Sequence, residues 1–184
     1  FWEEFGPAAL AMRIRCESMR DIGAAMAPHN AFLLLQGLET LNLRMQQHVS
    51  NAQAMVTWLQ QQDAVAWVNH PDINANAHTK LLFPKGAGSM LTFGVKGGRN
   101  AGAAFIDALQ LSSNLANVGD SRTLVLHPGS TTHSRLSETD LVAAGIGADL
   151  IRVSVGIENL KDIQADFSLG LRAAAKVVAH QAEA

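Results

Sequence analysis

The chain has 184 residues, of which 48% are hydrophobic, and its formal net charge is −2 at pH 7. Because the scattered Lys and Arg residues are almost balanced by Asp and Glu, there is no basic stripe of the kind that binds nucleic acid. No apolar run reaches the roughly 20 residues that cross a bilayer, so we expect a soluble protein without a membrane partner.

The first predicted element is a helix over residues 8–26, a run rich in Ala, Leu, Met and Arg. The only cysteine, Cys16, lies within this run, and we expect it to pack against neighbours and not to act as a nucleophile. A single cysteine cannot form a disulfide within the chain, which fits a reducing, cytoplasmic compartment.

A second helix is predicted from Asn30, a favourable N-cap residue, to about residue 59. Apolar residues recur there at intervals of three and four and form one stripe along the helix. The stripe consists of Leu34, Leu38, Leu41, Met45, Val49, Ala52, Val56 and Leu59. A helix of about 30 residues is about 45 Å long, so we expect it to link two bodies or to bend midway.

After residue 60 the sequence predicts short strands that alternate with loops and helices. The expected strands are 64–68, 90–95 and 151–155, with an extended segment at 112–118 and a short apolar piece at 124–126; the expected helices are 101–109, 137–144 and 160–180, and 71–79 is expected to be a polar loop. Ser137 is the predicted cap of the helix that follows it. The pattern indicates an α/β fold in which long connecting helices precede a small open sheet with helices packed on one face. We divide the chain into domains 1–60 and 61–184.

Arg152 stands inside the apolar strand 151–155, and a buried charge without a partner is costly. It therefore faces solvent, pairs with Glu158 or an aspartate, or binds an anion. A carboxylate is a suitable anion, because the planar guanidinium can donate two hydrogen bonds to it. The residues alone favour none of these alternatives.

The segment His127-Pro128-Gly129-Ser130-Thr131-Thr132-His133 gathers three hydroxyls and two imidazoles in a turn-like stretch. Such loops can carry a polar site, but composition favours a turn held by its own hydroxyl-to-backbone hydrogen bonds. No further ligands follow at a spacing typical of a metal site, so we predict none. Lys80 follows a polar loop, and we expect it to be exposed.

Four segments together resemble one enzyme family: NAFLLLQGLETLNLRMQQHVSNA, LTFGVKGG, LANVGDSRTLVLHPGSTTH and LIRVSVGIE. They occur in the order and at the spacing of the O-acetylhomoserine sulfhydrylases (O-acetylhomoserine aminocarboxypropyltransferases). These belong to the Cys/Met-metabolism group of fold-type I pyridoxal-phosphate (PLP) enzymes. The resemblance runs from about residue 5 to residue 171. It implies that the chain is the C-terminal part of such an enzyme, with 1–60 as the end of the large PLP domain and the inter-domain helix.

The resemblance also implies which residues bind the substrate. The family's arginine that binds the substrate α-carboxylate matches Arg152, and Asn117 and Thr132 match neighbours in the same pocket. Gly129 stands where the family usually has alanine, a difference expected to matter little. The family's Schiff-base lysine, the aspartate on the pyridine nitrogen and most phosphate contacts lie upstream of the matched segments. We therefore expect no catalytic and no cofactor-binding residue in this chain, and PLP to be bound mainly by the N-terminal part.

For the complete enzyme the resemblance implies a transferase that replaces the acetate of O-acetyl-L-homoserine by sulfide or a thiol, giving homocysteine or methionine. The expected partners are the N-terminal part of the same enzyme, further copies in a dimer or tetramer, and a small amino-acid substrate. Two alternatives stay open: a cystathionine γ-synthase or methionine γ-lyase of the same family, or a non-catalytic fragment that lacks the PLP lysine.

Overall fold

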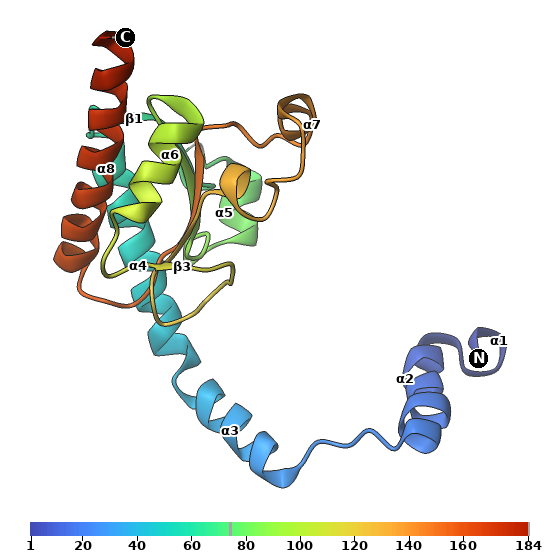
Figure 1. Ribbon diagram of the computed structural model, residues 1–184. Coiled ribbons are helices and arrows are strands. Elements are labelled where there is room, and N and C mark those ends of the chain that lie inside the picture. The colour runs from blue at the N-terminus through green and yellow to red at the C-terminus, as the bar shows by residue number, and fades with distance from the viewer. Residues whose placement is uncertain (74, 184) are drawn as a thin grey trace. The chain divides into compact units, whose positions relative to one another are not determined.

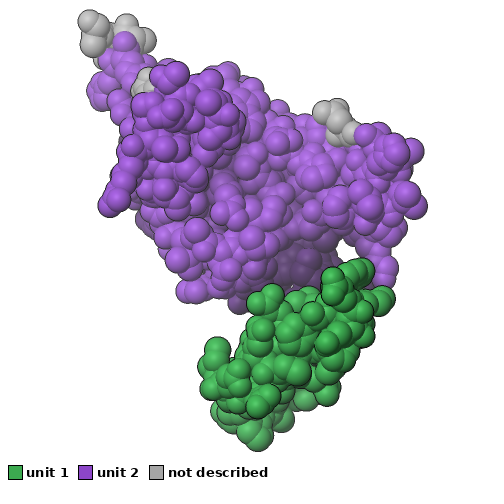
Figure 2. Space-filling view, turned by 90° about the vertical axis from the view of Figure 1, so that its right-hand side faces the viewer, with its two compact units in different colours: residues 1–42 green, residues 43–184 purple. Residues whose placement is uncertain are grey.

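The computed structural model describes residues 1–73 and 75–183, and Figure 1 shows the course of the chain. The residues form two compact units, 1–42 and 43–184, which are coloured separately in Figure 2. Within the described ranges, none of the helices combines the length and the apolar character that a membrane span requires.

Unit 1 is entirely helical. Its elements are α1 (Trp2–Phe5), the 3-10 helix η1 (Gly6–Ala8), α2 (Ala9–Arg13), the π-helix η2 (Ile14–Ile22) and α3 (Pro28–Glu39). The helix predicted over 8–26 is thus present but ends earlier. It ends at Ile22 because Gly23 adopts a left-handed conformation, with φ of 72°, which only glycine reaches without strain.

The predicted second helix is divided in two at Thr40, with α4 (Leu41–Leu59) following α3. Gly37 and Thr40 are both poor helix formers and lie near the middle of the predicted helix. The predicted start at Asn30 is wrong, because Ala27 is the N-cap and Pro28 takes the first helical position. Proline suits that position, since its missing N–H would have no partner within the helix.

Unit 2 contains a five-stranded sheet with the order β1-β2-β5-β4-β3. The strands are β1 (Val65–Asn69), β2 (Met90–Val95), β3 (Ser113–Asn114), β4 (Leu124–Leu126) and β5 (Leu150–Ser154). All neighbouring pairs are antiparallel except β3 and β4. The three predicted strands are confirmed, the short apolar piece is a strand, and the extended segment 112–118 contributes only two paired residues.

The helices of unit 2 after α4 are α5 (Ala77–Leu82), α6 (Gly98–Asp107), α7 (Glu138–Ala143) and α8 (Leu160–Glu183). Ser137 caps α7 as predicted, because its side chain accepts a hydrogen bond from the backbone N–H of Asp140. The end of the predicted loop 71–79 is instead helical. Asn76 caps α5 by accepting a hydrogen bond from the backbone N–H of Thr79 at 3.0 Å.

One face of the sheet carries the core. Alternate residues of β2, of β5 and of the position just after β5 are fully or almost fully buried on this face: Leu91, Phe93, Val95, Ile151, Val153 and Val155. They pack with buried residues of α4, α6 and α8, which Figure 1 shows gathered along one side of the sheet. The rings of Phe93, Phe105 and Phe167 meet with centroids 5.4 to 6.2 Å apart. The expected α/β architecture, with helices covering one face of a small open sheet, is confirmed.

Gly170 has a low helix propensity and therefore weakens α8, but it lets α8 approach α6 closely. A Cβ at this position would lie 2.6 Å from the ring of Phe105. The glycine is therefore explained by packing between α6 and α8, because no larger side chain fits between them.

Most of α4 belongs to unit 2, since Ala52, Met55 and Leu59 are completely buried in its core. The compact units accordingly divide at residue 42, earlier than the domain boundary drawn at residue 60. The reason is that only the second half of the apolar stripe is buried, whereas Leu34 and Leu38 are more than half exposed. The assignment of 1–60 to the end of a larger domain stays a prediction.

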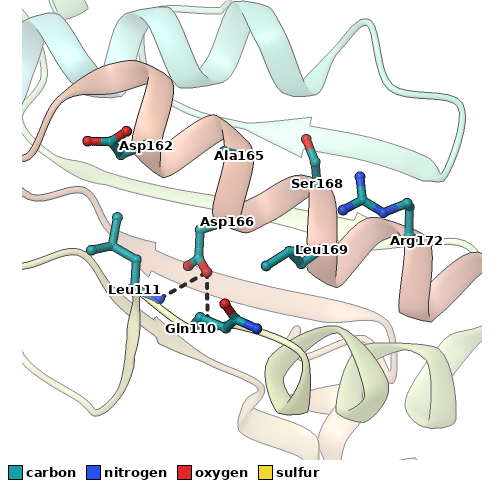
Figure 3. Close-up of a pocket in the computed structure, with 8 residues that line it drawn as sticks. All are labelled: Gln110, Leu111, Asp162, Ala165, Asp166, Ser168, Leu169 and Arg172. Atoms are coloured by element: carbon teal, nitrogen blue, oxygen red, sulfur yellow. Dashed lines mark hydrogen bonds between the residues drawn. The ribbon is translucent and has the colours of Figure 1, made fainter.

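A pocket of about 610 Å³ lies beside α8 and is lined by Asp166, which is almost fully buried (Figure 3). Burial opposes ionisation of this group. It is outweighed by hydrogen bonds from the backbone N–H groups of Gln110, Leu111 and Ser112 at 2.6, 3.0 and 2.9 Å, so the pKa of Asp166 is held below its ordinary value. The carboxylate thus fixes the loop between α6 and β3, and its acceptor capacity is taken up by the protein itself.

We expect Asp166→Asn to destabilise the protein by about 1–3 kcal/mol at pH 7, because the amide group cannot accept all three N–H bonds. Since the folded pKa is lowered, the contribution of the carboxylate is complete above the unfolded pKa of about 3.9 and is lost as the pH falls through the folded pKa. The difference between wild type and variant should therefore shrink below about pH 4. Urea unfolding at pH 7 and pH 3 measures it. Asp162→Asn, an exposed change on the same helix, should cost less than about 1 kcal/mol.

Candidate functional site

Arg152 lies on the face of the sheet opposite the core. Its neighbours Ile151 and Val153 face the helices, and successive side chains of a strand point to opposite faces. In register, it stands between Thr92 of β2 and Leu126 of β4. The arginine is therefore held near the middle of the sheet by pairing on both sides.

The guanidinium of Arg152 is half-buried, and within residues 1–73 and 75–183 it has no hydrogen-bond or ion-pair partner. Of the expected alternatives, the pair with Glu158 is not formed. Glu158 instead accepts hydrogen bonds from the backbone N–H and the hydroxyl of Thr123 at 2.6 and 2.9 Å. Arg152 is thus a cation whose hydrogen-bonding capacity stays available to a ligand.

A pocket of about 230 Å³ opens beside Arg152 on this face of the sheet. It is lined by Asn69, His70, Pro71, Met90, Leu91, Thr92 and Arg152. None of these seven residues is acidic, and Arg152 is the only one with a permanent charge. The electrostatics of the pocket therefore favour an anion.

His70, which the sequence gave no reason to select, also lines this pocket. Its side chain is completely buried, and its Nδ1 accepts a hydrogen bond from the backbone N–H of Asp72 at 3.2 Å. Nε2 has no partner among the described groups.

Asn117 and Thr132, the other two predicted site residues, lie on separate exposed loops, the first after β3 and the second after η3 (Pro128–Ser130). Asn117 Oδ1 accepts a hydrogen bond from the backbone N–H of Val118 at 2.8 Å. Thr132 Oγ1 and His133 Nδ1 are 2.8 Å apart and share one hydrogen bond. Neither side chain is hydrogen-bonded to Arg152 within the part of the chain described. Their roles as substrate ligands stay predictions.

The Asn117 loop is nevertheless attached to the strand of Arg152. The backbone N–H of Gly119 donates to the hydroxyl of Ser154 at 3.2 Å, and Ser154 lies two residues along β5 from Arg152 on the same face. Two residues of a strand span about 7 Å. The loop therefore passes the same face of the sheet that carries the arginine.

The segment from His127 to His133 is the self-bonded turn that its composition favours. The hydroxyls of Ser130 and Thr131 donate to the carbonyl of His127 at 3.4 and 2.8 Å. The buried ring of His127 is bonded through Nδ1 to Ser130 Oγ at 2.8 Å and through Nε2 to the carbonyl of Ala148 at 2.9 Å. This histidine is a structural residue, and its two nitrogens are not available to a ligand.

Sequence reasoning also missed two polar residues of α4 that hold the chain just after β5. His48, completely buried, is bonded through Nδ1 to the carbonyl of Val155 at 2.7 Å. Asn51 Nδ2 donates to the carbonyls of Gly156 and Glu158 at 3.0 and 2.9 Å. Asn51 follows His48 by three residues, and the buried Met55 follows Asn51 by four, so all three lie on the core side of the helix. This spacing could have identified the two polar residues from the sequence.

The groups that a metal or a covalent cofactor would need are not gathered in the described residues. No cluster of three or more His, Cys, Asp or Glu is present there that could hold a metal ion. The lysines are all exposed, as expected for Lys80: Lys80, Lys85, Lys96, Lys161 and Lys176. The candidate site thus offers an arginine and neutral polar groups.

Comparison with known proteins places this arrangement in a family. Residues 8–172 match the family described as Cys/Met metabolism PLP-dependent enzyme. The chain is 46% identical over 170 residues to the sulfhydrylase FUB7 of Fusarium oxysporum f. sp. lycopersici, covering 91% of this chain and 39% of the relative. It is 45% identical over 177 residues to the homocysteine synthase of Schizosaccharomyces pombe, covering 95% and 41%.

Among solved structures, the chain resembles a protein of Campylobacter jejuni described as an O-acetylhomoserine (thiol)-lyase, which carries a pyridoxyl-lysine monophosphate. The TM-score is 0.78 at 38% identity, and the match covers 92% of this chain and 41% of that one. The chain therefore spans about two fifths of the length of the relatives it matches.

Two glycines of the family-like segments should respond differently to alanine. At Gly129 a Cβ would lie 3.6 Å from the ring of His127, an ordinary contact, so Gly129→Ala should be neutral or stabilise by up to about 1 kcal/mol. At Gly156 a Cβ would lie 2.5 Å from backbone atoms of Arg122 and Thr123, so Gly156→Ala should cost about 2 kcal/mol or more. Thermal or urea unfolding of both variants tests this. A large loss at Gly129, or none at Gly156, would contradict the packing described.

Proposed function

The chain belongs to the Cys/Met metabolism family of PLP-dependent enzymes, and from this premise we propose that it is the C-terminal part of an O-acetyl-L-homoserine sulfhydrylase. In this proposal the complete enzyme replaces the acetate of O-acetyl-L-homoserine by sulfide or a thiol, giving homocysteine or methionine. The similarity to a sulfhydrylase, to a homocysteine synthase and to an O-acetylhomoserine (thiol)-lyase supports this choice within the family.

The observation that carries the proposal is the state of Arg152. Arg152 is half-buried, its guanidinium has no partner among the described residues, and it lines a pocket without carboxylates, so it is suited to receive the carboxylate of an amino acid. A guanidinium can donate two parallel hydrogen bonds to the two carboxylate oxygens, which fixes the orientation of the substrate as well as its position. Arg152 in this role anchors the substrate and does not itself take part in bond making.

We propose that PLP is bound mainly by the remaining part of the enzyme, and the exposure of all five lysines of this chain supports this. When bound, PLP supplies the electron sink for chemistry at the carbons of an amino acid. We assign the residues that hold it to the remaining part of the enzyme. The contribution of this chain is to bind and orient the substrate carboxylate.

Asn117 and Thr132 are proposed to support the same carboxylate from their loops. Both side chains are exposed and can donate and accept hydrogen bonds. The attachment of the Asn117 loop to Ser154 supports its placement near the arginine. Each of these neutral groups would add directional bonds to the charge supplied by Arg152.

We further propose that residues 1–60 form the end of the large domain and its connection to the small domain, 61–184. Exposed apolar side chains of α3, among them Phe32, Leu34 and Leu35, suit burial against further protein in the complete enzyme. A cytoplasmic location and a homo-oligomeric state, dimer or tetramer, belong to the same proposal.

In the complete enzyme, Arg152→Ala should lower kcat/KM for O-acetyl-L-homoserine by about thirty- to several-thousandfold, because losing a charged partner costs roughly 2–5 kcal/mol. Arg152→Lys should recover only part of this, since an ammonium lacks the two-pronged geometry. Steady-state kinetics with sulfide or cysteine as acceptor, together with product analysis, measure the effect and identify the reaction. The visible spectrum of the bound cofactor is the control and should be unchanged. Near-normal kcat/KM in Arg152→Ala, or loss of the cofactor, would exclude the assigned role.

A further inference from the structure

The register of the sheet places three polar side chains in one row across three neighbouring strands. Asn69 of β1 is paired with Thr92 of β2, and Thr92 is paired with Arg152 of β5. Directly paired residues point to the same face, and their Cβ atoms are about 4.5–5.5 Å apart. An amide, a hydroxyl and a guanidinium therefore stand side by side on the face opposite the core.

All three side chains of this row line the pocket of about 230 Å³. Within the described ranges of the chain, neither Thr92 nor Asn69 makes a side-chain hydrogen bond, and Arg152 has no partner either. Thr92 and Arg152 are half-buried and Asn69 is exposed, and polar groups at such positions are normally paired with protein or solvent. Three adjacent ones whose capacity is unused by the protein make a surface suited to a polar ligand.

The three side chains of the row differ in length. Thr92 is short and stands between Arg152 and Asn69, so the row is lowest at β2. Pro71, Met90 and the completely buried His70 also line the pocket. A small group seated over Thr92 would contact the hydroxyl below it and the guanidinium beside it.

We propose that Thr92, with Asn69, completes the carboxylate subsite of Arg152, an inference that rests on the proposed function. Arg152 supplies the charge, and the Thr92 hydroxyl and the Asn69 amide donate hydrogen bonds to the carboxylate. The absence of acidic side chains from the lining residues agrees with an anionic occupant. The carboxylate is thus held from the strands themselves, which are more rigid supports than the loops of Asn117 and Thr132.

The test is equilibrium binding to the complete, cofactor-loaded enzyme of L-norvaline, which has no leaving group, and of L-norvalinamide, which lacks the carboxylate charge. Thr92→Val removes the hydroxyl and keeps the branched shape that suits a strand. Since a hydrogen bond to a charged group is lost, norvaline should bind about tenfold more weakly, or worse, while norvalinamide binding changes less than about twofold. Thr92→Ser should restore norvaline binding. Asn69→Ala should weaken it to a smaller extent.

Thr57→Val is the matched control, because Thr57 lies on α4, is not among the lining residues of the pocket, and donates its hydroxyl to the carbonyl of Gln53. It should leave the binding of both ligands unchanged. If Thr92→Val bound norvaline as wild type while Arg152→Ala lost it, this inference would be wrong and the proposed function would stand. If Thr92→Val weakened both ligands equally, its role would be structural only, which also overturns the inference. If Arg152→Ala itself bound norvaline normally, the proposed function would fail first.

Discussion

The position of β5 in the sheet is the constraint on which the site depends. Ile151 and Val153 are completely buried against the helices, so the pleat of the strand sends Arg152 to the opposite face. Pairing with β2 on one side and β4 on the other fixes the height of the arginine along the sheet. A slip of one residue in either pairing would bury a charge and expose two apolar side chains, so the hydrophobic core and the candidate site enforce the same register.

The end of β5 is held by hydrogen bonds from polar groups of α4, and of the two ring nitrogens of His48 only Nδ1 has a partner among the described residues. His48 and Asn51 of α4 take up three carbonyls between residues 155 and 158, and Glu158 in turn bonds Thr123 in front of β4. The helix and both strands are thereby tied at one point. The close approach at Gly156, where a Cβ would meet backbone atoms, belongs to the same junction. Buried polar networks of this kind favour one arrangement, because each group left unpaired costs free energy.

Some polar side chains that line pockets are already hydrogen-bonded within the protein, whereas others have no partner among the described residues. Asp166 lines the pocket of about 610 Å³, but its carboxylate already accepts hydrogen bonds from three backbone N–H groups, and His127 is bonded through both nitrogens. Arg152 and Thr92 lie at a smaller pocket and are not used by the described part of the chain. The size of a pocket is therefore a poorer guide to a binding site here than the unused hydrogen-bonding capacity of the groups that line it.

The sequence by itself determined the elements whose signals are local. The strands 90–95 and 151–155, the cap at Ser137 and the self-bonded turn after His127 follow from alternation and from short-range hydrogen bonds, and the four family-like segments pointed to Arg152. The tertiary structure decided what depends on residues distant in the chain. Contacts between distant residues decide which half of the α4 stripe is buried and why Gly170 is needed between α6 and α8. They also supply the hydrogen-bond partners of His48 and Asn51. The row of Asn69, Thr92 and Arg152 joins positions far apart in sequence, and only the register of three strands brings them together.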